Sequence, residues 1–288
     1  RNHAFDRGWA ASHELPLPSV SIGNLTVGGS GKTPVASWVA RYLSDRGALP
    51  GILLRGYGRD EVLLHQHAVP GGVVVADPNR HAGAERAVSL GAQVLVLDDA
   101  FQRRDVRRDL DVLLVAAEAA RAVRSCLPAG PWREPIAGAR RADFVIVTRK
   151  RADPVTSIEV ARELGALTEA TVGVIHLGVA RYVGMLTGRD VSGTDLAGKR
   201  VVAASAIADP EAFIAQTKGT GAQVQPATWK DHHEFRDEDV AWLAGAARKA
   251  DFLILTEKDA VKLRDRWPAS IAEPLVADPA LLVDQVEG

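Results

Sequence analysis

A glycine-rich stretch near the start of the chain constrains the fold more than any other feature, because it ends in Gly31-Lys32-Thr33. A short apolar run over residues 19–22 leads into it, and a pattern with helical period follows at once. One face of that expected helix carries Val35, Trp38, Val39, Tyr42 and Leu43. Strand, glycine loop, Lys-Thr and helix in this order predict a phosphate-binding loop of the Walker A type.

The chemistry of such a loop follows from its residue types. Glycines let backbone N–H groups turn towards an anion, and the helix starting near Thr33 adds its positive end. Lys32 is suited to the β- and γ-phosphates of a nucleotide, and the Thr33 hydroxyl is suited to Mg²⁺. The alternative is a glycine-rich turn with a surface lysine. The residues expected to bind the nucleotide are Thr26, Val27, Gly28, Gly29, Ser30, Gly31, Lys32 and Thr33.

Composition limits the class of partner. The 288 residues carry a formal net charge of -1, and aromatic residues make up 5%. Neither value favours nucleic acid as a partner. The single Cys126 excludes an intramolecular disulfide and fits a reducing compartment. No apolar stretch of the sequence is long enough to span a bilayer. The chain begins at Arg1 rather than Met, so we expect that residues in front of it are missing.

Short apolar runs alternate with helical patterns along the chain, which predicts an α/β protein with a mostly parallel sheet. We expect a phosphate-loop NTPase-like domain over residues 1–170 and a second, smaller α/β domain over residues 171–288, whose C-terminal end could pack back on the first. Near the boundary, two extended segments are expected on either side of Ala180-Arg181. Ligands of such sheets bind beyond the carboxyl ends of the strands.

Two acidic pairs fall at such positions. Asp98 and Asp99 follow the apolar run 94–97, and beside a phosphate loop this pattern predicts a Mg²⁺ site. Asp60-Glu61 follows the loop 55–59, where a carboxylate could take a proton from an attacking hydroxyl. The simpler interpretation of Asp60-Glu61, which spacing alone favours, is an acid pair in the first turn of a helix.

Two further clusters leave alternatives open. Residues 231–235, Asp-His-His-Glu-Phe, are dense in titratable groups, but adjacent histidines lack the spacing of a helical zinc site, so a turn-capping cluster is favoured. The basic run over residues 103–109 is typical of a solvated face, although it could also meet an anionic substrate or a membrane surface.

Taken together, these motifs resemble the tetraacyldisaccharide 4'-kinase family, the lipid A 4'-kinases of Gram-negative bacteria. The resemblance spans nearly the whole chain in the order of the family's motifs. The matching segments are residues 21–34, Arg55-Gly56-Tyr57-Gly58, Asp98-Asp99-Ala100-Phe101-Gln102, residues 127–135, residues 231–235 and residues 256–262. It implies a two-domain kinase that uses ATP and Mg²⁺ to phosphorylate the 4'-hydroxyl of tetraacyldisaccharide 1-phosphate. It also implies peripheral work at the cytoplasmic face of the inner membrane.

The resemblance also implies residue roles. Lys32 and Thr33 match nucleotide and metal residues, and Asp98 and Asp99 match the Mg²⁺ region. Asp60 matches the family's catalytic base, and His232 matches a histidine that supports this base from the second domain.

The chain departs from the family pattern in places. The segment before Asp60 is shorter than in the family, Arg59 and Val62 replace a flanking Gly and Pro, and Ala100 and Arg103 replace a Gly and a His. The family's N-terminal hydrophobic helix is not in this sequence. Two other functions therefore stay open: a kinase for another hydroxyl acceptor, and a nucleotide-binding homologue without transferase activity.

Overall fold

The computed structural model describes residues 5, 7–56, 58–121 and 124–284. The chain divides into two compact units, one made of residues 1–176 with 283–288 and the other of residues 177–282. The division falls within strand β7 (Thr171–Gly184) rather than in front of it. The chain therefore passes from one unit to the other along β7 and returns along β12 (Leu275–Val283). Each unit is described by itself.

The sheet of the first unit is parallel, with its strands in the order β7-β6-β5-β1-β4-β2-β3. The central strands β1, β4 and β2 are short apolar runs that are almost wholly buried, as expected where helices cover both faces of a parallel sheet. The strands that precede β7 are β1 (Ser19–Asn24), β2 (Pro50–Leu54), β3 (Val73–Ala76), β4 (Val94–Asp98), β5 (Leu110–Ala116) and β6 (Phe144–Arg149).

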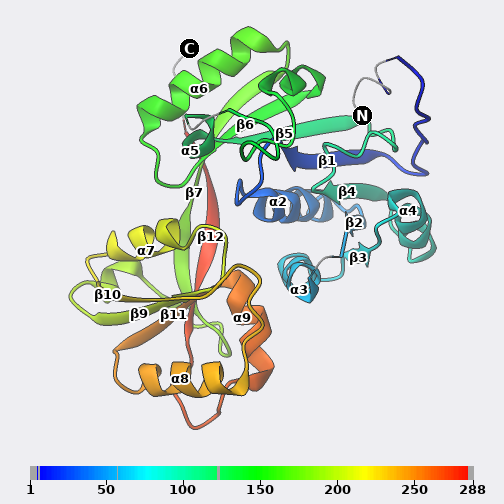
Figure 1. Ribbon diagram of the computed structural model, residues 1–288. Helices are drawn as coiled ribbons and strands as arrows, with labels where there is room; N and C mark the ends of the chain where they lie inside the picture. Colours follow the sequence, from blue (N-terminus) through cyan, green and yellow to red (C-terminus); the bar gives the residue numbers. More distant parts are fainter. Residues whose placement is uncertain (1–4, 6, 57, 122–123, 285–288) are drawn as a thin grey trace. The chain divides into compact units, whose positions relative to one another are not determined.

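Helices pack on this sheet, with α2 against β1, β2 and β4, α4 against β2 and β3, and α6 against β6 (Figure 1). Helix α6 begins at Pro154 because the carboxylate of Asp153 accepts the Thr156 N–H and caps the first turn. The helices of the first unit are α2 (Lys32–Ser44), α3 (Arg59–Ala68), α4 (Arg80–Ser89), α5 (Ala117–Ala120), α6 (Pro154–Leu167) and the 3₁₀ helix Ile136–Arg141.

The buried face of α2 differs from the face that the sequence pattern indicated. Val35, Ala36, Ser37 and Ala40 are buried, whereas Trp38 and Tyr42 are 51% and 42% exposed. The two aromatic rings stack on each other at the surface, with centroids 5.5 Å apart. The sequence pattern predicted the helix correctly but its inner face only in part: Val35 is buried, whereas the small side chains of Ala36 and Ala40 take the buried positions expected for Trp38 and Tyr42.

The second unit is a smaller α/β unit whose strands follow the order β10-β9-β11-β12 and are parallel. Its core holds apolar side chains of these strands and of α8, among them Leu243, Leu253 and Leu255. The elements are β8 (Asp190–Val191), the 3₁₀ helix Gly193–Leu196, β9 (Arg200–Ser205), α7 (Pro210–Lys218), β10 (Gln223–Thr228), α8 (Asp237–Ala247), β11 (Phe252–Thr256), α9 (Glu257–Leu263) and the 3₁₀ helix Arg264–Arg266.

One expectation about this region is wrong. The sequence suggested two extended segments separated at Ala180-Arg181, but β7 continues through both residues without a break. Arg181 lies within the strand, and its guanidinium donates to Asp278 and Asp190. Of the residues described, no helix has the length and apolar character needed to cross a bilayer.

Candidate functional site

The glycine-rich loop lies at the carboxyl end of β1 and runs directly into α2. Gly28 and Gly31 have φ of 114° and 85°, values that favour glycine, and Gly31 is the N-cap of α2. Two side chains brace the loop from behind: Asn24 Nδ2 donates to Ser30 Oγ at 2.8 Å, and Thr148 Oγ1 donates to the Ser30 carbonyl at 3.1 Å. The structure thus has the strand, loop and helix that a phosphate loop requires.

The start of this loop is tied to the segment over residues 125–133. The Val27 N–H donates to the Pro131 carbonyl and the Arg133 N–H donates to the Leu25 carbonyl, both at 2.7 Å. Thr26 also forms an isolated bridge with Trp132. The Val27 N–H is therefore engaged within the protein, and the later residues of the loop are the ones placed at the helix end, where phosphate binds.

Asp98, the last residue of β4, lies beside the end of the loop. The Thr33 hydroxyl donates to Asp98 Oδ2 at 3.1 Å. Burial would raise the pKa of Asp98, but the hydrogen bond and charge of His65, the charge of Lys32 and the Thr33 hydroxyl together hold this pKa below its ordinary value. A buried carboxylate that stays ionised beside a phosphate loop is suited to a cation.

His65 is a member of this site that the sequence did not reveal. Its ring is fully buried, with Nε2 3.1 Å from Asp98 Oδ2 and Nδ1 2.9 Å from Ser37 Oγ. These three residues come from α3, β4 and α2, so only the folded chain brings them together. No spacing in the sequence could have signalled the contact.

Asp99 faces cations instead. Its φ is 52°, a value that few residues other than glycine adopt, and its carboxylate is 2.6 Å from Arg133 and 3.8 Å from Lys32. The surrounding network continues through Gln102, whose amide Nε2 donates to Glu134. The sequence placed Arg133 and Glu134 in a motif without assigning them a function.

The donor set fits Mg²⁺ bound together with a nucleotide. Within the part of the chain that the structure describes, the buried Asp98 Oδ1 has no hydrogen-bond partner, while Asp98 Oδ2 is held by its neighbours. An ionised oxygen of this kind suits a metal ion or its bound water. Mg²⁺ commonly uses one or two carboxylates plus phosphates and water, so Asp98 and the lone pairs of Thr33 suffice. Asp99, which already meets Lys32 and Arg133, would act by its charge.

Asp60 lies in the first turn of α3, next to Glu61, so the acid pair at a helix start is confirmed as a structural feature. The Asp60 residue is only 2% exposed. Helix α3 packs against α2, which places Asp60 in the same unit as the phosphate loop.

His232 belongs to the second unit and lies in an exposed turn. Its φ is 60°, and its Nε2 is 3.2 Å from Lys258 Nζ, which also donates to Asp231 at 2.9 Å. The adjacent His233 bonds to Asp239 at 2.9 Å, so the two histidines point to different partners. Among the described residues, no group of three His, Cys, Asp or Glu side chains could hold a metal ion.

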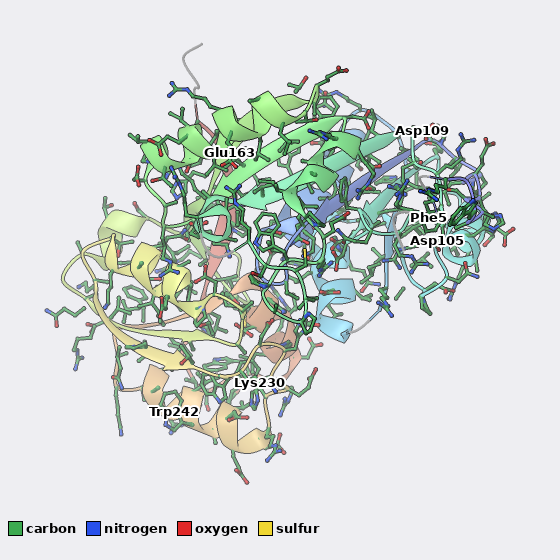
Figure 2. The ribbon with its side chains drawn as sticks, turned by 45° about the horizontal axis from the view of Figure 1, so that its top comes forward. Phe5, Asp105, Asp109, Glu163, Lys230 and Trp242 are labelled. Carbon is green, nitrogen blue, oxygen red and sulfur yellow. The ribbon has the colours of Figure 1, made fainter. Side chains whose placement is uncertain are left out.

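The basic run over residues 103–109 is largely paired within the protein. Arg103 contacts Asp105 at 2.7 Å, and Arg108 contacts Asp111 at the same distance. Asp109 accepts the Ser19 N–H at 2.7 Å, which places it at the amino end of β1, whereas the phosphate loop lies at the carboxyl end. Asp105 and Asp109 are both labelled on the right-hand side of Figure 2. Arg107 also contacts Glu14 at 3.0 Å, so Arg103, Arg107 and Arg108 of this run are each paired with a carboxylate.

These features define a phosphate-loop nucleotide-binding protein, with a parallel sheet, a Gly-Lys-Thr loop and an acidic residue at the end of a neighbouring strand. The family model described as "Tetraacyldisaccharide-1-P 4'-kinase" matches residues 1–283. The chain belongs to this family.

Named relatives and a solved structure agree with this assignment. The chain is 37% identical to the tetraacyldisaccharide 4'-kinase of Geobacter metallireducens, covering 90% of this chain and 82% of the relative. It is 34% identical to that of Xanthomonas campestris pv. campestris, covering 96% and 84%. The crystal structure of LpxK from Aquifex aeolicus in complex with ATP superposes with a TM-score of 0.77 at 27% identity, covering 99% of this chain and 90% of that chain. Family, fold class and kinase activity, as predicted from the sequence, are therefore confirmed.

Proposed function

We propose that this chain transfers the γ-phosphate of ATP to the 4'-hydroxyl of tetraacyldisaccharide 1-phosphate. The observation that carries the proposal is the contact of Thr33 with Asp98 beside the Gly-Lys-Thr loop, in a chain that matches the 4'-kinase family over residues 1–283. The ATP of the Aquifex aeolicus structure supports ATP as the donor. Kinases of this kind work mainly by positioning and by neutralising charge.

In the first unit, we assign the phosphates to the backbone of residues 28–33 and to Lys32, whose side chain is 15% exposed. Thr33 and Asp98 would hold Mg²⁺, which supplies neutralising charge on the phosphates when it is bound. Asp99 would set the position of Lys32 through their 3.8 Å contact.

For the acceptor, we assign Asp60 as the base. The hydroxyl oxygen would attack the γ-phosphorus, the bond from that phosphorus to the β,γ-bridging oxygen would break, and the hydroxyl proton would pass to Asp60. We assign His232 as a residue that supports this proton transfer, on the family resemblance of residues 231–235. Its ring carries a nitrogen within hydrogen-bond distance of Lys258, so it is already set in a charged environment.

The acceptor is a lipid, and we therefore place the reaction at the cytoplasmic face of the inner membrane, with the protein bound peripherally. The nature of the acceptor supports this location, since a tetraacylated molecule partitions into a bilayer. Separation of membrane and supernatant fractions in different salt concentrations tests it. Recovery of the protein only in the supernatant at every salt concentration would contradict the location.

The experiment for the function uses the chain with [γ-³²P]ATP, Mg²⁺ and tetraacyldisaccharide 1-phosphate in mixed micelles. Label in a disaccharide that now carries phosphate at both the 1 and 4' positions is the expected result. Label only in other sugar or lipid hydroxyls would favour a kinase with another acceptor. Tight ATP binding with no transfer to any acceptor would favour a homologue without transferase activity.

A further inference from the structure

His65 contacts Asp98 in the nucleotide site of the first unit, and nothing in the family resemblance assigns it a role. We propose that His65 is a positioning residue that holds Asp98 in the orientation needed for Mg²⁺ and nucleotide. The inference depends on the metal role that we assign to Asp98. Its basis is geometric: a fully buried ring bridges the side chains of Ser37 and Asp98.

The carboxylate of Asp98 fixes the direction of its hydrogen bond with His65. An ionised carboxylate only accepts, so Nε2 of His65 donates to Asp98 Oδ2. Nδ1 bonds to the Ser37 hydroxyl, as acceptor in a neutral ring and as donor in a charged one, and Nε2 donates to Asp98 in either form. Ser37 thus holds the second ring nitrogen and orients the ring towards Asp98, as partners of the second nitrogen generally do.

In this arrangement the two carboxylate oxygens of Asp98 have different surroundings. Oδ2 accepts from both Thr33 and His65, whereas the buried Oδ1 has no partner among the described residues. A carboxylate held at one oxygen by two donors cannot rotate without losing both bonds in a water-poor site. His65 therefore keeps Oδ1 available for the metal ion or its bound water.

The contact of His65 with Ser37 also holds helix α3 against α2. Arg41 of α2 donates to the carbonyl of Ala68 at the end of α3, at 2.6 Å from Nη2, so the helix is held to α2 at two points. Asp60 lies in the first turn of this helix. The placement of the proposed base and the placement of the metal carboxylate thus share one anchor.

A histidine that only fills the core would look similar, so the test must separate the two roles. His65→Gln keeps an amide donor at about the reach of Nε2, whereas His65→Asn reaches only as far as Nδ1. Both variants remove the ring, and Asn leaves a space larger by one methylene, so the melting temperature of each variant records the lost packing. The main measurement is the gain from Mg²⁺, which is the ratio of the affinity for a fluorescent ATP analogue in Mg²⁺ to the affinity in EDTA. The values of kcat, KM and the melting temperature are measured on the same variants.

We expect His65→Asn to lower the gain from Mg²⁺, and kcat with it, by about 10- to 100-fold, the usual range for residues that orient a metal ligand. His65→Gln should restore most of both, while the melting temperatures of the two variants fall together. Equal losses in both variants, or an unchanged gain from Mg²⁺ in His65→Asn, would overturn the proposal.

Two further variants keep the result interpretable. Should His65→Asn not fold, Ser37→Ala removes only the hydroxyl that orients the ring, and a gain from Mg²⁺ equal to that of the wild type would overturn the proposal. Asp98→Asn tests the metal role on its own. If Asp98→Asn loses the gain from Mg²⁺ and His65→Asn keeps it, positioning by His65 is wrong and the metal site stands. If Asp98→Asn keeps it, the metal role fails, and the proposal for His65 fails with it.

Discussion

The His65–Asp98 pair is enclosed in the first unit, with side-chain exposures of 0% and 5%, whereas His232 and Asp231 in the second unit are 44% and 35% exposed. The enclosed pair is 3.1 Å apart and each member has a further partner in the same unit. The exposed pair is 3.8 Å apart and lies around Lys258, which contacts both members.

The difference shows that the contacts of a buried residue reveal its role more clearly than the contacts of an exposed one. A buried polar group must be satisfied by the protein, so its partners disclose its orientation and charge. An exposed group can exchange its partners for water or substrate at little cost, so its contacts leave its role open. The nucleotide site can therefore be interpreted from one unit alone, while the role of His232 must come from kinetics.

The largest effect is expected for Lys32→Ala, in the enclosed region. The variant lacks the ammonium charge that stabilises the transferring phosphoryl group, so turnover should fall by roughly 10³-fold. The fold should stay intact, because the Lys32 side chain points towards the ligand and not into the core. Transfer of labelled γ-phosphate measures it, with Lys218→Ala on the exposed side of α7 as the matched control. A Lys32→Ala variant with near-normal turnover would remove the phosphate-loop assignment.

Asp60→Asn should follow, with a loss of about 10²-fold or more in kcat, because the base is lost while the shape is kept. Binding of ATP should remain within a small factor of the wild type. Glu61→Gln, one residue on in the same helix turn, is the control. If Glu61→Gln loses activity and Asp60→Asn does not, the base is Glu61.

Sequence reasoning was strongest where function depends on local order. The Gly-Lys-Thr loop, the strand before it and Asp98 at a strand end are contiguous patterns, and the structure has each of them. It failed where the decisive contacts link distant segments: His65 meets Asp98 and Ser37 only after β4 and α2 are packed. The exposed stack of Trp38 and Tyr42 shows the same limit, since helical period cannot tell which face small residues will bury.

Glu118 extends the comparison to a partly buried carboxylate, for which the expected effect is smaller. Burial would raise the pKa of Glu118, but backbone N–H groups of Arg151, Ala152 and Lys150, at 2.8, 3.0 and 2.8 Å, hold this pKa below its usual value. Because the folded-state pKa is lowered, the stabilisation is present above the unfolded value and is lost as pH falls through the folded one.

We expect Glu118→Gln to lower the free energy of unfolding by about 1 kcal/mol at pH 7, allowing for partial exposure to water, with the deficit shrinking below about pH 4. Urea unfolding at pH 7 and at a pH below about 4 measures the effect, and Glu169→Gln, at an exposed position, is the control. A deficit that is the same at both pH values would show that the charge of Glu118 contributes nothing.

The central claim is that the enclosed residues of the first unit bind the nucleotide and that His232 acts in the transfer alone. The direct measurement is the affinity for ATP with Mg²⁺, by calorimetry, and the turnover, both on one preparation of His232→Ala. The account predicts an affinity within about twofold of the wild type and a turnover lowered by roughly 10²-fold, as for loss of support to a general base. An affinity that falls as far as the turnover, or a turnover that does not change, would contradict it.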